Sequence, residues 1–339
     1  MKLLIDIHHK SVVSIMHIFL SMILLLSLPM AVQSAPKLDL TNPQPAQSMQ
    51  TLIDALRSKN DQERITAARY LGEFGPAAKA SANALTQSLK DPNPELRLYA
   101  AGALSKIAPD SPSTVAALAS ALRDEAATVR AAAARGLQTI GPGAKSAVDA
   151  LIQALKDQDA SVRWSAAQAL GSIGPAAGSA TTALSKALQD EVPNVRSAAA
   201  QALGQIGPNA KSAAPALIAT FTDKEQTVRN FAARSLAQTG SDSAVPALAK
   251  LLKTEDWRDR VVAAQGLEMM GPKAKSALPA LLEALKDKVK HVRVYAAYAL
   301  GAIGPEAKTA IPLLSEALKE QDPFIHASAE RALIAIRAQ

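Results

Sequence analysis

The chain has 339 residues, a net charge of +7 at neutral pH, no cysteine and only 3% aromatic residues, while 48% of its residues are hydrophobic. The lack of cysteine excludes disulfides, lipid-modified cysteine and thiolate metal sites. Alanine is prominent among the apolar residues, and it suits helices, whereas strands favour β-branched and aromatic residues. The composition therefore predicts an all-α protein. The small positive excess favours acidic partners but identifies none.

The first 34 residues have the order of a secretory signal peptide. Two lysines precede an apolar stretch over residues 18–28, and a run of small residues ends at Ala35. This order predicts cleavage near Ser34 and a periplasmic or secreted protein, with no stable membrane insertion after cleavage. An uncleaved anchor is the alternative, because residues 11–32 are nearly long enough to span a bilayer.

Residues 35–48 contain three prolines among polar residues and show no apolar periodicity. They are predicted to form a flexible linker. The expected organisation is thus a signal peptide over residues 1–34, a linker over residues 35–48 and a repeat region over residues 49–339.

One arginine recurs along the repeat region every 33 residues, with one interval of 31. This anchor series is Arg64, Arg97, Arg130, Arg163, Arg196, Arg229, Arg260, Arg293 and, as a substitute, His326. An alanine always follows three residues after the anchor and a leucine seven residues after it. On a helix, the positions one before and three, seven and ten after the anchor share one side, so they predict one buried stripe per repeat.

A Gly-Pro pair follows most of these stripes. The pairs begin at Gly75, Gly141, Gly174, Gly207, Gly271 and Gly304. We expect the glycine to end the anchor helix in a left-handed conformation and the proline to prevent its continuation. Since a second amphipathic segment follows, such as residues 146–156, each repeat is predicted to be a helical hairpin.

The motif, rather than the period, distinguishes the repeat class. Ankyrin repeats share the period of 33, but their Thr-Pro-Leu-His motif is absent here. Residues 161–175, SVRWSAAQALGSIGP, resemble the short HEAT-like repeat of phycobilisome lyases and many bacterial proteins, and the resemblance extends from Met49 to the C-terminus. It implies a bacterial α-solenoid in which about nine hairpins stack into a right-handed superhelix, and the predicted signal peptide makes it an exported member.

The resemblance also implies a ladder of hydrogen bonds between repeats, formed by the anchor arginines and by aspartates six residues before them. The aspartates are Asp91, Asp124, Asp157, Asp190, Asp223 and Asp287. Thr254 stands in this position before Arg260, where the interval is shortened. We therefore predict a softer joint between residues 240 and 260.

Positions one, two, five and nine after each anchor point away from the buried stripe. The resemblance implies that they line a concave groove, and aromatic residues interleaved with arginines are typical of binding hot spots. The candidate partner-binding residues are Tyr99, Arg135, Trp164, Gln168, Gln201, Phe231, Arg234, Tyr295 and Tyr298, and Arg69, Glu73, Lys106 and Arg331 occupy the same positions. Alternatively, residues two after the anchor, such as Phe231 and Tyr295, lean on the adjacent repeat and seal the inner surface.

A row of lysines follows the Gly-Pro pairs. Its members are Lys79, Lys145, Lys211, Lys275 and Lys308. They are expected to be solvated loop residues, and a basic edge that binds a polyanion is the alternative.

No catalytic motif is recognisable. After loss of the signal only His291 and His326 remain, and the glycines belong to repeat caps or helices rather than to a phosphate-binding loop. We expect a non-enzymatic scaffold that needs no cofactor or metal and binds a protein or peptide, not nucleic acid, on its concave face. A bilin-lyase-like or chaperone-like role is the alternative, and the oligomeric state is not indicated.

Overall fold

The computed structural model describes residues 45–338, so the predictions of a signal peptide and of most of the linker lie outside the described residues. The chain divides into two units, Met1–Ala46 and Gln47–Gln339, and the repeat region is the second. Its described residues form α-helices and short 3-10 helices and contain no strand. The predicted all-α class is confirmed.

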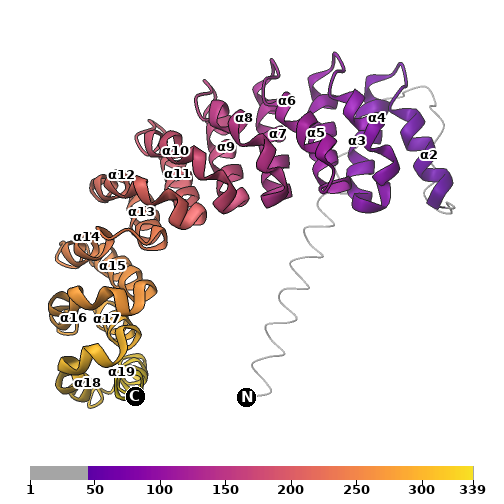
Figure 1. Cartoon of the computed structure of the whole chain (residues 1–339). Coiled ribbons are helices and arrows are strands. Elements are labelled where there is room, and N and C mark those ends of the chain that lie inside the picture. The colour runs from indigo at the N-terminus through magenta and orange to yellow at the C-terminus, as the bar shows by residue number, and fades with distance from the viewer. Residues whose placement is uncertain (1–44, 339) are drawn as a thin grey trace, which may run out of the picture. The chain divides into compact units, whose positions relative to one another are not determined.

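Two layers of helices alternate along the chain, and each anchor residue lies in a helix of the inner layer (Figure 1). The inner helices are α3 (Asp61–Phe74), α5 (Pro94–Ile107), α7 (Ala127–Ile140), α9 (Ala160–Ile173), α11 (Pro193–Ile206), α13 (Gln226–Thr239), α15 (Trp257–Met270), α17 (Lys290–Ile303) and α19 (Pro323–Arg337). The outer helices are α2 (Pro45–Ala55), α4 (Ala82–Ser88), α6 (Pro112–Ala121), α8 (Val148–Ala154), α10 (Thr181–Ala187), α12 (Ala214–Ala219), α14 (Ala244–Leu251), α16 (Leu278–Ala284) and α18 (Ile311–Ala317).

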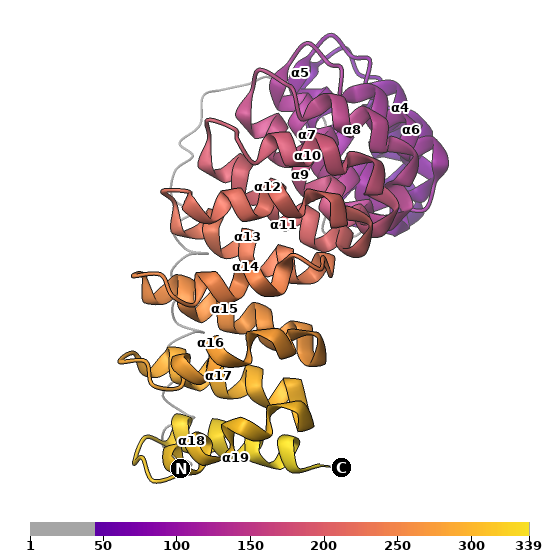
Figure 2. The ribbon, with the colours of Figure 1, turned by 60° about the vertical axis from the view of Figure 1, so that its left-hand side comes forward.

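Successive hairpins of this unit lie side by side in chain order, and the inner helices occupy the concave side of the row (Figures 1 and 2). Within residues 45–338 there are nine hairpins, from α2–α3 to α18–α19. The predicted α-solenoid is therefore confirmed. Helix α2 begins at Pro45, inside the residues expected to form the linker.

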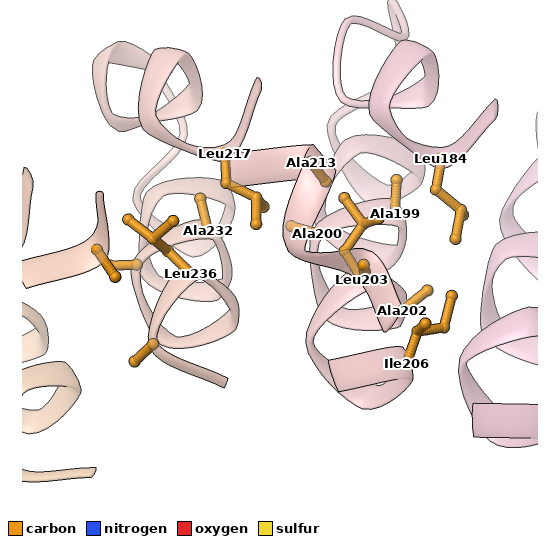
Figure 3. Close-up of a cluster of buried hydrophobic side chains, with 14 of the residues drawn as sticks. Leu184, Ala199, Ala200, Ala202, Leu203, Ile206, Ala213, Leu217, Ala232 and Leu236 are labelled. Atoms are coloured by element: carbon orange, nitrogen blue, oxygen red, sulfur yellow. The ribbon is translucent and has the colours of Figure 1, made fainter. Parts of the chain in front are cut away.

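The buried stripe of each inner helix holds the hairpins together. In α9, Val162, Ala166, Leu170 and Ile173 are all at most 1% exposed. Figure 3 shows the same arrangement around Leu203, which lies among alanines of its own helix. Because alanine is small, neighbouring helices approach closely, while leucine and isoleucine fill the space between repeats. Each buried leucine contributes about 1.5–3 kcal/mol through removal of its surface from water.

The Gly-Pro pairs end the inner helices, but the predicted left-handed conformation is wrong for the six glycines that precede proline. Their φ angles are +55° to +75° and their ψ angles −130° to −143°. Only Gly240, which Ser241 follows, is left-handed, with φ 62° and ψ 24°. A proline ring clashes with a helical conformation in the residue before it, and this restriction accounts for the difference.

Each Gly-Pro pair opens a 3-10 helix that leads into the outer helix. These segments are Gly75–Ser81, Gly141–Ala147, Gly174–Ala180, Gly207–Ala213, Gly271–Ala277 and Gly304–Ala310, and a further short one covers Thr220–Thr222. At these pairs the connection from an inner helix to the outer helix of the next hairpin is therefore a short 3-10 segment rather than an irregular loop.

Candidate functional site

Arginine and aspartate side chains form a ladder along one edge of the repeat region. Arg130 donates from Nε and Nη2 to the Asp157 carboxylate of the next repeat, at 2.7 and 2.8 Å. Its Nη1 donates to the backbone carbonyl oxygens of Asp124 and Glu125, at 2.8 and 2.9 Å. Arg97, Arg163, Arg196 and Arg260 also bind the carboxylate of the next repeat through two nitrogens. The ladder is therefore a structural device that links consecutive repeats.

The ladder continues across the repeat in which Thr254 replaces the aspartate. Arg229 donates to Asp256 and to Asp259, both at 2.9 Å. The shortened interval thus moves the acceptors two and five residues along the chain instead of removing them. The sequence analysis did not identify these replacement acceptors, although Asp256 lies only two residues after Thr254. The softer joint between residues 240 and 260 stays a prediction.

The ladder lowers the pKa of two of its carboxyl groups, those of Asp157 and Asp223. Hydrogen bonds from Arg130 hold the pKa of the Asp157 carboxyl below its usual value, although partial burial opposes this effect. Hydrogen bonds from Arg196 lower the pKa of Asp223 in the same way. These carboxylates are therefore ionised and paired at neutral pH, and they are not free to act as acids or bases.

The first candidate binding surface is a hollow of about 320 Å³ on the inner side of α3, α5 and α7. Its charged lining residues are Arg69, Glu73, Lys106 and Arg135, and Tyr99 contributes its ring. All five belong to positions that the sequence places in the groove. Two predicted site residues, Tyr99 and Arg135, thus lie together. We call this surface the amino-terminal hollow.

The amino-terminal hollow owes its depth to Gly102. This glycine occupies the position five residues after the anchor, where Arg69 and Arg135 stand in the adjacent repeats. A Cβ atom at Gly102 would meet no neighbouring heavy atom within 4 Å. The sequence analysis did not identify Gly102 as a site residue, although its position five residues after the anchor Arg97 was known.

A second, smaller hollow of about 160 Å³ lies on α15, α17 and α19. It is lined by Glu268, Tyr298 and Arg331, among small residues. The Arg331 guanidinium lies 5.7 Å from the centroid of the Tyr298 ring, and Tyr295 contacts the same ring edge-on at 6.0 Å. Burial raises the pKa of the Glu268 carboxyl, and the charge of Arg331 opposes this shift.

The remaining predicted site residues are not gathered into one pocket. Trp164, Phe231 and Tyr295 are half-buried and pack against the hydrophobic core. Arg234 is exposed, and the amide of Gln168 donates weakly to that of Gln201 at 3.4 Å. Tyr99 also packs partly against the core and is half-buried.

The lysine row lies at the surface, and two of its members are paired. Lys211 lies 3.0 Å from a carboxylate oxygen of Asp242, and Lys275 lies 2.7 Å from one of Glu306. Both partners belong to the following repeat, so these lysines form exposed links between repeats. Such exposed ion pairs contribute about 0–1 kcal/mol each.

Hollows also occur between consecutive outer helices. One lies between α8 and α10 and measures about 390 Å³, and another lies between α10 and α12 and measures about 480 Å³. A third, between α4 and α6, measures about 250 Å³. Because such hollows recur between neighbouring repeats, they follow from the stacking of short helices. They do not by themselves mark a specific site.

Among residues 45–338, no group of three or more histidine, aspartate or glutamate side chains is arranged to hold a metal ion. None of the helices in the same range has the length and apolar character needed to cross a bilayer.

Comparisons with known proteins agree with this architecture. The sequence profile for HEAT repeats matches residues 49–138, 115–181, 148–229, 181–268 and 251–334. No curated protein matches this sequence. Among solved structures, an engineered protein is 25% identical, with a TM-score of 0.57, over 86% of this chain and 89% of its own. Importin beta shares the fold at 17% identity and a TM-score of 0.60, over 86% of this chain and 45% of its own.

Proposed function

The chain belongs to the HEAT-repeat family, and from this membership we propose that it is a non-enzymatic scaffold that binds a segment of a protein partner along its inner helices. HEAT-repeat solenoids act in general as protein-interaction scaffolds, because stacked repeats create an extended surface. We further propose that the partner lies on the concave side of the row of hairpins.

The row of side chains five residues after the anchors carries this proposal. Each inner helix contributes one member, and none belongs to the buried stripe or to the ladder. The row is Arg69, Gly102, Arg135, Gln168, Gln201, Arg234, Gln265, Tyr298 and Arg331, all exposed or half-buried. We call it the inner row. Long polar side chains at regular spacing suit the backbone and side chains of an extended segment.

Site-specific photo-crosslinking tests the proposal. A photoreactive amino acid at Gln168 or Arg234 of the inner row is compared with the same residue at Gln153 or Gln189, which are exposed on the outer helices and their loops. We expect crosslinks to a protein in the native extract from the inner positions and none from the outer positions. Crosslinks from the outer positions alone, or from neither set, would show that the inner row is not the binding surface.

Export is a separate part of the proposal. A signal peptide over residues 1–34 is supported by the order of lysines, apolar stretch and small residues. Mass spectrometry of the mature chain is expected to find Ala35 as the first residue, in the extracytoplasmic fraction. An intact Met1 in a membrane fraction would favour the anchor instead.

A further inference from the structure

We propose that the amino-terminal hollow on α3, α5 and α7 is a site for an acidic side chain, aspartate or glutamate, of the bound protein segment. This inference rests on the proposed function, and it names the chemistry that one part of the inner row recognises. The geometry, charge and free volume of the hollow support it independently of one another.

The charge of the hollow favours an anion. Three cations, Arg69, Lys106 and Arg135, line it against one carboxylate, that of Glu73. Neither Lys106 nor the Arg135 guanidinium forms an ion pair or a side-chain hydrogen bond with another described residue. These two groups therefore have hydrogen-bond donors available for a ligand, whereas a ladder arginine such as Arg130 uses Nε, Nη1 and Nη2 within the repeat region.

The volume of the hollow suits a side chain rather than a flat surface contact. The space above Gly102 is open, because a Cβ there would meet no neighbouring heavy atom. Charged groups of α3 and α7 stand on either side of this space, and Lys106 follows one turn later on α5. A carboxylate that enters over Gly102 thus comes between guanidinium and ammonium groups, and such charge-assisted hydrogen bonds are stronger than neutral ones.

The ring of Tyr99 favours a peptide over a free ion as the ligand of the hollow. Tyr99 lines the same hollow and packs partly against the core. A half-buried aromatic ring beside cations offers apolar contact to the methylene groups and backbone next to the acidic side chain. An inorganic anion would leave that contact unused.

The other hollows lack this combination. The hollow between α8 and α10 contains Lys156 and Lys186, but its lining has no aromatic ring, and its carboxylate, that of Asp190, is paired with Arg163. It provides a matched control, because it is comparable in size and lies on the outer helices.

Fluorescence anisotropy with two labelled peptides tests the inference on the full mature chain. One peptide alternates glutamate with glycine and serine, and the other has glutamine in place of each glutamate. We expect the glutamate peptide to bind about tenfold more tightly and its binding to weaken as salt is added. Equal binding of the two peptides, or no binding of the glutamate peptide, would overturn the inference.

Variants locate the binding. Gly102→Leu fills the open space with a good helix former, and Arg135→Gln removes a cation; each is expected to weaken binding of the glutamate peptide about tenfold. The control Lys156→Gln/Lys186→Gln is expected to bind like the unmodified chain. Unchanged binding by both inner variants, with melting temperatures like that of the unmodified chain, would contradict the site.

A single-stranded DNA oligonucleotide of matched charge separates a carboxylate site from a general polyanion surface. We expect it to bind more weakly than the glutamate peptide and to be insensitive to Gly102→Leu. DNA binding of equal strength that Gly102→Leu abolishes would overturn the inference.

Failure of the inference and failure of the proposed function are distinguishable. Crosslinks from Gln168 and Arg234 together with equal binding of the two peptides would refute only the acidic site. Specific binding of the glutamate peptide without any inner crosslinks would refute only the proposed function.

Discussion

Each inner helix carries two sets of long polar side chains, and their roles differ because their surroundings differ. The anchor arginines are largely buried and hold at least two acceptors each, as Arg163 does with the carboxylates of Asp190 and Glu191 and two carbonyl oxygens. Arg135, five residues after an anchor, is exposed and has no such partner. The same residue type is therefore structural in one position and available for binding in the other.

Arg163→Gln tests the structural role. It leaves the Asp190 carboxylate without its guanidinium in a site where both side chains are 10% exposed, so we expect a loss of about 3 kcal/mol in the free energy of unfolding. Urea unfolding measures this loss. The control Arg135→Gln is expected to change stability by about 0.5 kcal/mol or less. Equal losses for the two variants would contradict the assignment.

The ladder predicts how stability depends on pH. The pKa values of Asp157 and Asp223 are lowered in the folded chain by their arginine partners, so ionisation of these groups stabilises the fold. This contribution is complete above the unfolded pKa of about 4 and is lost as the pH falls through the lower folded values. Urea midpoints should therefore drop between about pH 5 and pH 2. If the urea midpoint of an Asp157→Asn variant falls equally steeply with pH, Asp157 does not contribute to this pH dependence.

Gly102 and Gly171 both lie in inner helices, but Gly102 borders open space and Gly171 is closely packed. At Gly102, alanine meets no neighbour and favours the helix, so Gly102→Ala is expected to raise the unfolding free energy by about 0.5–1 kcal/mol. At Gly171, a Cβ would lie 3.0 Å from the Ala202 Cα atom of the next helix, and Gly171→Ala is expected to lower stability. Thermal unfolding of both variants measures the difference. Shifts of the same sign would contradict it.

At the scale of the helices, much of the structure follows from the period of the sequence. The leucine and alanine positions predict the buried stripe because helical geometry alone places them on one side. The conformation of Gly75 and its equivalents was predicted wrongly, because the general preference for a left-handed cap was applied where proline forbids it. The depth of Trp164 could not be predicted, since a helical angle does not reveal how far the neighbouring helix covers a ring.

Helix α9 offers a test of how stability is distributed. Leu170 is fully buried, and Leu170→Ala is expected to cost about 2–5 kcal/mol. Because each hairpin packs mainly on its neighbours, hydrogen exchange should accelerate in α7, α9 and α11 more than in α17. Trp164→Ala, at a half-buried position, is expected to cost about 1–2 kcal/mol. Uniform acceleration along the chain would contradict a locally stabilised solenoid.

At the scale of the whole repeat region, the buried stripe occupies one side of every inner helix, and the ladder arginines occupy α3 to α17. The inner row belongs to neither, and its composition changes from repeat to repeat, whereas the alanine and leucine of the buried stripe recur in every repeat. This division between constant and variable positions was readable from the sequence. The sequence did not reveal the hollow over Gly102 or the substitution of Asp256 and Asp259 for the missing aspartate, because both depend on side chains from adjacent repeats.

The central claim is that a protein segment lies along consecutive members of the inner row. A crosslinking scan over Gln168, Gln201, Arg234 and Gln265, with Gln153 and Gln189 as outer controls, tests it most directly. The account predicts that one partner protein is captured from successive inner positions and from none of the outer ones. Capture from the outer helices, with none along the inner row, would contradict it.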